Sequence, residues 1–182
     1  GAEPINVGRK ASAKSKERLQ RLRIVSQNCR GLKRDEDFEE MYKSFDDEKI
    51  FAACLQETWR EGIEQLGRTG KVIKTILAGK TQQTGRGSCG VGIALGEKGI
   101  QAWKDAGSQV FNDFGPCLVA VRLQVKDEKG QDVGIFLASL YRHTEWDWKE
   151  FETTMDRCLA KKKPGDIVLI GADCNASMGS NH

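Results

Sequence analysis

The chain has 182 residues, of which 38% are hydrophobic and 30% are charged, and its formal net charge is +3. This is the composition of an ordinary globular protein, long enough for one domain with a sizeable core. No apolar run approaches the length of a membrane span and there are only two histidines, which excludes a membrane-spanning helix and a histidine-rich metal site.

The N-terminal residues carry most of the positive charge. Seven Lys or Arg and two Glu lie within residues 1–23, which gives this segment +5 and leaves −2 for the remainder. We expect residues 1–22 to form a basic, disordered arm that either contacts nucleic acid or is only solvated. No signal-peptide core follows these charges, and the six cysteines are scattered singly as in a reducing compartment, so an intracellular protein is expected.

A strand–helix–strand unit is predicted to follow the arm. Residues 22–29 and 50–55 are apolar runs that indicate strands, and polar residues stand at the end of each. Between them, Asp35 is expected to cap a helix with one buried face. The apolar residues of that face are Phe38, Met41, Tyr42 and Phe45. Such a unit normally has parallel strands.

The rest of the chain is predicted to consist of strands separated by turns, then one helix and a last strand. Strands are expected over residues 72–78, 91–95, 118–125 and 133–141. Thr144 is expected to cap the helix. Its buried face is predicted to contain Trp148, Phe151, Met155 and Leu159. Residues 165–176 indicate a strand buried on both faces.

This order of elements predicts an α/β fold in which two sheets pack face to face with helices outside, a four-layer α/β/β/α sandwich. Ligands of such sheets bind at the carboxyl ends of strands. The polar residues found there are Asn28, Glu57, Tyr141, Asp173 and Asn175. Structural alternatives exist at each position: Glu57 pairs with Arg60, Asp173 caps a turn, or the hydroxyl of Tyr141 is bonded inside the core.

Five motifs carry a resemblance to a known family. They are Ser26–Leu32 (SQNCRGL), Leu55–Trp59 (LQETW), Gly90–Ile93 (GVGI), Ser139–Tyr141 (SLY) and Gly171–Ala176 (GADCNA). In order and spacing they resemble the endonuclease/exonuclease/phosphatase superfamily, which has the deoxyribonuclease I-like fold. Within it, residues 23–182 look most like the apurinic-type endonuclease domain of non-LTR (LINE-type) retrotransposons, and like the craniofacial development protein 2-like sequences that carry such a domain.

The resemblance implies a role for each residue at the strand ends. Glu57 would be the carboxylate ligand of a catalytic Mg²⁺, with Mn²⁺ as an alternative. Asn28 would hold Glu57 and the metal or a phosphate oxygen. Asp173 would orient or deprotonate the attacking water, and Asn175 and Tyr141 would contact the scissile phosphate, where charge develops in the transition state.

Two departures from the family pattern affect these expectations. Arg30 stands where some relatives place a further acid, and it suits a phosphate rather than a cation. Arg86 and Arg142 are further candidates for contact with the phosphate or DNA. The family also finishes on a Ser-Asp-His type motif, which this chain lacks. We therefore expect residues 23–182 to be the N-terminal part of the domain, with an incomplete second sheet, marginal stability and little activity.

The function that these expectations favour is Mg²⁺-dependent phosphodiester hydrolysis by an endonuclease that nicks DNA. The expected partner is double-stranded DNA, without a stable oligomer or a membrane, in the nucleus. Two alternatives stay open. One is a truncated or domesticated domain that binds nucleic acid or a partner without catalysis. The other is a phosphatase of the same superfamily.

Overall fold

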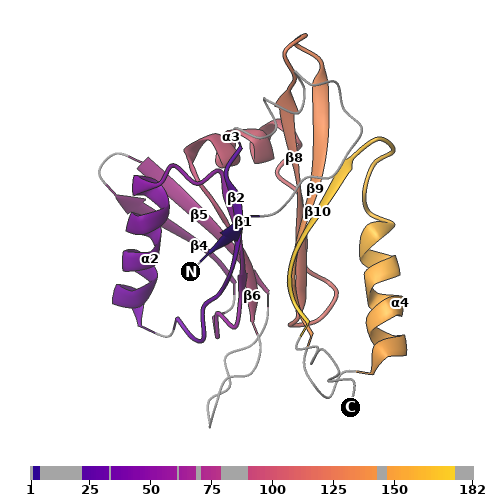
Figure 1. The fold of residues 1–182 in the computed structure, drawn as a ribbon, viewed down its shortest axis with the longest axis horizontal. Coiled ribbons are helices and arrows are strands. Elements are labelled where there is room, and N and C mark those ends of the chain that lie inside the picture. The colour runs from indigo at the N-terminus through magenta and orange to yellow at the C-terminus, as the bar shows by residue number, and fades with distance from the viewer. Residues whose placement is uncertain are drawn as a thin grey trace, which may run out of the picture.

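Two β-sheets face each other in the computed structural model, which describes residues 2–4, 22–32, 34–60, 62–68, 71–78, 90–142 and 147–174 (Figure 1). The first sheet has the strand order β1-β2-β3-β6-β5-β4 and the second has the order β10-β9-β8-β7. The predicted sandwich of two sheets with helices outside is therefore confirmed. None of the described helices is long and apolar enough to cross a membrane.

The first sheet is built on the predicted strand–helix–strand unit. Its strands are β1 (Glu3–Pro4), β2 (Ile24–Asn28), β3 (Ala52–Gln56), β4 (Gly62–Arg68), β5 (Lys71–Ala78) and β6 (Val91–Leu95). β2 and β3 are parallel, as predicted, and the other neighbours are antiparallel. Helix α2 (Asp35–Asp47) connects β2 to β3 and packs its four predicted apolar residues against the outer face of the sheet.

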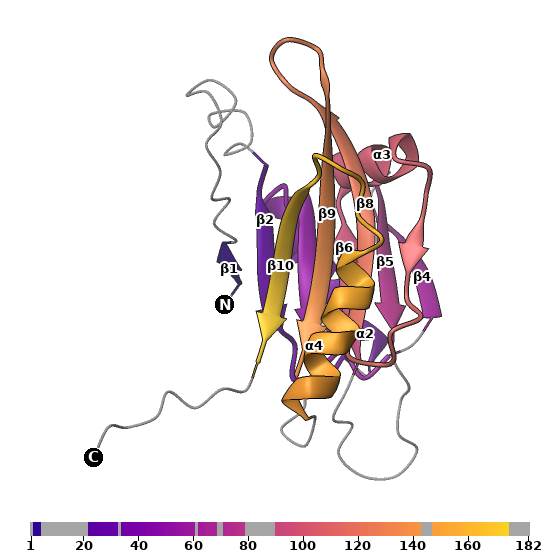
Figure 2. The ribbon, with the colours of Figure 1, turned by 90° about the vertical axis from the view of Figure 1, so that its right-hand side faces the viewer.

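The second sheet contains β7 (Val110–Phe111), β8 (Leu118–Lys126), β9 (Asp132–Tyr141) and β10 (Ile167–Asp173). β8 and β9 form the predicted antiparallel hairpin, and β10 lies parallel to β9. Helix α4 (Trp148–Leu159) covers the outer face of this sheet (Figure 2). Its partly buried residues are Phe151, Met155 and Leu159, as predicted. Trp148 is 50% exposed, so its predicted burial was wrong.

The core between the two sheets is apolar and tightly packed where β3 and β10 meet. A side chain at Gly171 of β10 would overlap Cys54 of β3, because the two backbones approach each other closely there. Helix α3 (Glu97–Asp105) adds Ala102 and Trp103 to this core. It lies at the opposite end of the sandwich from the carboxyl ends of β2, β3 and β10 (Figure 1). The close contact between Gly171 and Cys54 fixes the distance between the two sheets where β3 and β10 meet.

Several elements differ from the sequence-based expectations. α3, β4 and the two-residue strands β1 and β7 were not predicted. β1 pairs Glu3 and Pro4 with β2, so the expected disorder of residues 1–22 is wrong for these two positions. Most of the remaining arm lies outside the described residues. Asp35 does not cap α2: it is the first helical residue, and its carboxylate binds Arg60 at 2.9 Å. Thr144 lies outside the described residues.

A buried ion pair joins β8 to the start of β10. Two nitrogens of Arg122 donate to the two carboxylate oxygens of Asp166 at 2.7 and 2.6 Å, and the Lys163 amide donates to Asp166 at 2.9 Å. Burial alone would raise the pKa of Asp166, but the hydrogen bonds from Arg122 and Lys163 and the charges of Arg122 and Lys162 outweigh it, so this pKa lies below its ordinary value. Gly134 leaves the space for the pair.

Asp166→Asn is predicted to lower the free energy of unfolding by about 3–5 kcal/mol at neutral pH, because it leaves Arg122 buried without its anion. Since the pKa of Asp166 is depressed in the folded state, the contribution of the pair is complete above the ordinary Asp pKa of about 3.9 and is lost as the pH falls through the folded-state value. Urea unfolding at pH 7 and at acidic pH measures this.

The matched control for this variant is Asp132→Asn, which breaks an exposed pair with Lys126 in the same sheet. This change is expected to cost no more than about 1 kcal/mol. Equal losses in the two variants would show that the buried pair makes no special contribution.

Candidate active site

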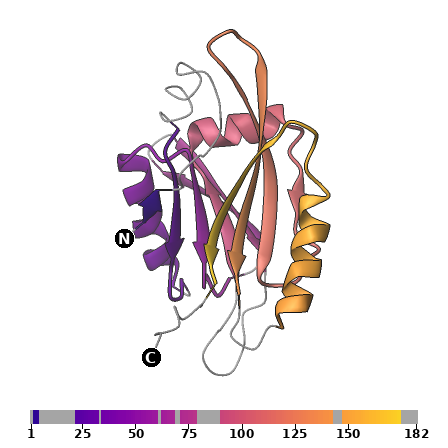
Figure 3. The same ribbon diagram turned by 45° about the vertical axis from the view of Figure 1, so that its right-hand side comes forward.

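Four of the predicted site residues meet at one end of the sandwich. Asn28 ends β2 and Glu57 directly follows β3 in the first sheet, whereas Tyr141 ends β9 and Asp173 ends β10 in the second. Asn28 is in register with Gln56, and Asp173 with Tyr141. The carboxyl ends of these strands point in the same direction (Figure 3). This arrangement gathers residues that are up to 145 positions apart in the chain.

The side-chain amide of Asn28 joins the two sheets at this end. Its nitrogen Nδ2 donates to Glu57 Oε2 at 2.5 Å and to Asp173 Oδ2 at 2.7 Å. Its oxygen Oδ1 accepts the backbone N–H of Arg30 at 2.9 Å, which fixes the orientation of the amide because only an oxygen can accept that hydrogen. Both hydrogens of one amide are thus shared between carboxylates of different sheets.

The position of Asn28 agrees only partly with its expected role. It holds Glu57, as expected, but its nitrogen rather than its oxygen faces the carboxylates. An amide N–H cannot bind a cation, so in this orientation Asn28 donates to both acids, and its expected contact with the metal or a phosphate oxygen stays a prediction. Its contact with Asp173 was not foreseen from the sequence.

The backbone around Glu57 is held in a conformation that is uncommon for residues other than glycine. Glu57 has φ +51° and Trp59 has φ +56°. Backbone hydrogen bonds to the loop after β2 secure this turn: Gly31 N–H donates to Glu57 O at 2.7 Å and Leu32 N–H donates to Thr58 O at 3.0 Å. A side chain at Gly31 would overlap the ring of Trp59. The turn therefore depends on the loop that carries Asn28.

A buried polar network lies beneath the acids. The side-chain nitrogen of Gln56 is within 3.1 Å of Ser26 Oγ, 3.4 Å of Ser139 Oγ and 3.2 Å of the Gly171 carbonyl oxygen. The Ser139 hydroxyl donates to the Leu55 carbonyl at 2.8 Å. These contacts link β2, β3, β9 and β10 in one layer. The sequence signal for this network is a set of polar residues inside otherwise apolar strands, namely Ser26, Gln56 and Ser139, and the network itself was not predicted.

Tyr141 and Asp173 lie on the same face of the second sheet, because they are paired in register. Tyr141 is buried in the core between the sheets, and its N–H donates to the Cys117 carbonyl at 2.9 Å. The Arg142 N–H donates to the Asp173 carbonyl at 2.8 Å, so the ends of β9 and β10 are tied together. Tyr141 therefore lies beside Asp173, and contact of its hydroxyl with a phosphate stays a prediction.

The candidate phosphate-binding arginines are in different environments. Arg30 is exposed, has φ +49°, and follows Asn28 at the rim of the site. The Arg142 side chain is largely buried, with its guanidinium 3.7 Å from the centre of the Trp148 ring. Arg86 and Asn175 lie outside the described residues. The structure therefore places Arg30 beside the acids and the Arg142 side chain against α4, and contact of either residue with a phosphate stays a prediction.

The donor set at this end fits a hard divalent cation. Glu57 and Asp173 supply carboxylate oxygens, and a Mg²⁺ ion is commonly held by one or two carboxylates while it keeps several waters. In the described part of the chain, no donor other than Asn28 bonds to the Glu57 carboxylate, and no group of three metal-binding side chains occurs. The alternative pairing of Glu57 with Arg60 was wrong, since Arg60 binds Asp35 and the Leu32 carbonyl.

Cys29 is the thiol next to the site, and its surroundings keep it protonated at neutral pH. Burial raises the pKa of Cys29 to about 12, and the negative charge of Glu57 adds to this, although a hydrogen bond with the Gln56 backbone acts in the opposite direction. Since the thiolate is the reactive form, this raised pKa disfavours a nucleophilic role for Cys29. The site is consistent with attack by water.

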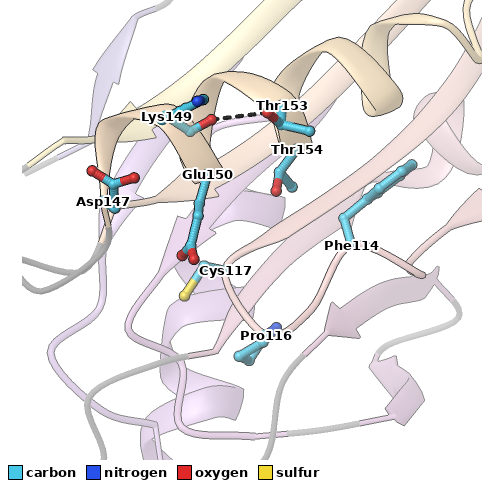
Figure 4. A pocket seen from close by; sticks show the side chains of 8 residues that line it. All are labelled: Phe114, Pro116, Cys117, Asp147, Lys149, Glu150, Thr153 and Thr154. Carbon is cyan, nitrogen blue, oxygen red and sulfur yellow. Dashed lines mark hydrogen bonds between the residues drawn. The ribbon is translucent and has the colours of Figure 1, made fainter.

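A hollow of about 800 Å³ opens beside the strand end that carries Tyr141, between the loop before β8 and the first turns of α4 (Figure 4). Its lining residues are Phe114, Pro116, Cys117, Asp147, Lys149, Glu150, Thr153 and Thr154. The side chain of Glu150 is directed toward Cys117 (Figure 4). The carboxylates of Asp147 and Glu150 outnumber the ammonium of Lys149, so the hollow is negatively charged and does not suit a phosphate.

Comparison with solved structures confirms the fold. The chain is similar to the endonuclease domain of TRAS1, a telomere-specific non-LTR retrotransposon, with a TM-score of 0.51 and 16% sequence identity. The match covers 86% of this chain and 60% of the TRAS1 chain, so this chain spans less than two thirds of that structure. No family model and no curated protein matches. The predicted resemblance to a retrotransposon endonuclease therefore holds for the fold.

Asn28→Ala is predicted to lower the free energy of unfolding by about 1–3 kcal/mol, because two neighbouring carboxylates lose the donor that they share. Urea unfolding at neutral pH in a chelating buffer is the measurement. The control is Asn112→Ala at an exposed position before β8, which should change stability by less than about 0.5 kcal/mol. If both variants unfold at the same urea concentration as the wild type, the Asn28 contacts contribute no net stability.

Proposed function

We propose that this chain hydrolyses phosphodiester bonds in DNA with the help of a divalent cation, and that it acts as a nicking endonuclease. The observation that carries the proposal is the pair of carboxylates held by Asn28, at 2.5 and 2.7 Å from one nitrogen atom. Two carboxylates that accept from the same nitrogen atom lie close enough to repel each other, and a cation or a proton reduces this repulsion. A divalent cation meets this need.

Each residue has a defined task in the proposed reaction. A bound Mg²⁺ or Mn²⁺ would supply positive charge for the phosphoryl oxygen and the leaving oxygen. Glu57 would hold that ion, because its carboxylate is fixed by Asn28 at one oxygen and by the strained turn at its backbone. Asp173 would accept a proton from the attacking water, and Asn28 keeps it aligned. Tyr141 would place its hydroxyl toward the scissile phosphate.

A nucleic acid is the proposed substrate. The TRAS1 domain that this chain resembles in fold is an endonuclease domain. Arg30 adds an exposed positive charge at the rim of the acids, and residues 1–23 add a charge of +5. These charges favour a polyanion over a small phosphate ester. We extend the proposal to double-stranded DNA and to a nuclear location.

The proposal predicts conversion of supercoiled plasmid to open circles by this chain in the presence of Mg²⁺, and no conversion with chelator. Glu57→Gln should reduce the rate at least about 100-fold, as expected for a group that acts on the charge of the transition state. The control is Glu128→Gln, which lies in the exposed β8–β9 hairpin at the far end of the sheet and should nick at the wild-type rate.

Other outcomes of this assay would support the alternative functions. Plasmid binding by the wild type and Glu57→Gln without nicking would favour a binding domain. Release of phosphate from a monoester, without nicking, would favour a phosphatase. Nicking that is unaffected by chelator and by Glu57→Gln would contradict the proposed site.

A further inference from the structure

Trp148 is an exposed large hydrophobic side chain, with half of its surface accessible. It begins α4, and Phe151 packs against it edge to face with 5.4 Å between ring centres. The next apolar residues of the helix face the second sheet, as an amphipathic helix requires. The exposure of Trp148 is therefore not explained by the packing of α4.

The side chain of Arg142 packs against one face of the Trp148 ring. The guanidinium carbon of Arg142 lies 3.7 Å from the centre of the Trp148 ring, within the range of a cation–π contact. Arg142 is itself only 8% exposed. The buried guanidinium of Arg142 therefore fixes the orientation of the exposed Trp148 ring and places a positive charge against one of its faces.

The Arg142–Trp148 pair lies next to the acids. Arg142 directly follows Tyr141, and its N–H donates to the carbonyl of Asp173 at 2.8 Å. Figure 1 shows the first turn of α4 at the same end of the sandwich as the ends of β9 and β10. One residue, Arg142, thus contacts the backbone of the catalytic strand with its amide and the exposed ring with its side chain.

We propose that Trp148, supported by Arg142, is a stacking platform for an unpaired nucleobase next to the phosphate on which Glu57 and Asp173 act. This inference rests on the proposed function and narrows its substrate class. An exposed aromatic ring can stack on any base, but the bases inside a paired duplex are covered on both faces. The preferred substrate is then DNA with an unpaired or displaced base beside the cleavage position.

The charged residues around Trp148 favour one orientation of a bound DNA strand. Arg30 puts an exposed positive charge beside the acids, where the backbone phosphates would pass, whereas the guanidinium of Arg142 lies against the Trp148 ring on the α4 side of the second sheet. Asp147 and Glu150 line the hollow on the neighbouring side of the same helical turn and would repel phosphate. A strand bound at the acids would therefore keep its phosphates near Arg30 and turn its base toward Trp148.

The test is binding of a fluorescent oligothymidine of about ten nucleotides, measured by anisotropy with chelator so that no cleavage occurs. Trp148→Ala should weaken this binding about 10- to 100-fold, the effect of losing one base–aromatic stack. Trp148→Phe should keep most of it. A fully paired duplex of the same length should bind the wild type and both variants within about 2-fold.

Arg157→Gln is the matched control, because Arg157 also lies over an aromatic ring, that of Phe114 at 5.6 Å, but near the other end of α4. It should bind oligothymidine like the wild type. Far-ultraviolet circular dichroism and the urea midpoint of each variant confirm that it is folded. If Trp148→Ala were misfolded, the comparison of Trp148→Phe with a Trp148→Leu variant of similar apolarity would carry the test.

Three results would overturn the platform: an unchanged affinity for oligothymidine in Trp148→Ala, an equal loss for oligothymidine and duplex, or no binding of oligothymidine by the wild type. The plasmid assay separates these failures from failure of the proposed function. Nicking that depends on Glu57 but is unaffected by substitution of Trp148 would contradict the stacking role of Trp148 and leave the proposed endonuclease function intact. Binding of oligothymidine that depends on Trp148, without nicking of plasmid, would support the stacking role of Trp148 and contradict the proposed endonuclease function.

Discussion

The site depends on one amide group. Asn28 donates both hydrogens of Nδ2, one to Glu57 from the first sheet and one to Asp173 from the second. This geometry is available only if the two sheets lie at a fixed distance at their carboxyl ends. The contact of Gly171 with Cys54 and the hydrogen bonds of Gln56 set that distance. The packing of the core thus determines the arrangement of the acids.

The energetically unfavourable features of the structure lie at the carboxyl ends of the strands, where the acids meet. Two carboxylates lie close together, and Arg30, Glu57 and Trp59 have positive φ angles that residues with a side chain rarely adopt. Interlocked backbone hydrogen bonds between the loops after β2 and β3 hold these conformations. Unfavourable geometry that the surrounding structure enforces is common where a site must be ready for its ligand. The buried Arg122–Asp166 pair lies at the start of β10, away from the acids.

The sequence was sufficient for what depends on local pattern. Apolar runs that end in polar residues located β2, β3, β9 and β10, and therefore Asn28, Glu57, Tyr141 and Asp173. Long-range contacts were not predictable in this way. The bond from Asn28 to Asp173 spans 145 positions, and the Gln56 network depends on the separation of the sheets. Trp148 was misassigned because helical spacing cannot show whether the first turn of a helix extends past the sheet that it covers.

The central claim is that one amide of Asn28 joins both acids, and the NMR signals of its two side-chain hydrogens test it most directly. We predict that both hydrogens of Nδ2 resonate downfield in the wild type. Glu57→Ala should move one resonance upfield and Asp173→Ala the other, since each carboxylate accepts a different hydrogen. If neither substitution moved either resonance, the amide would not connect the two acids, and the account of the site would be wrong.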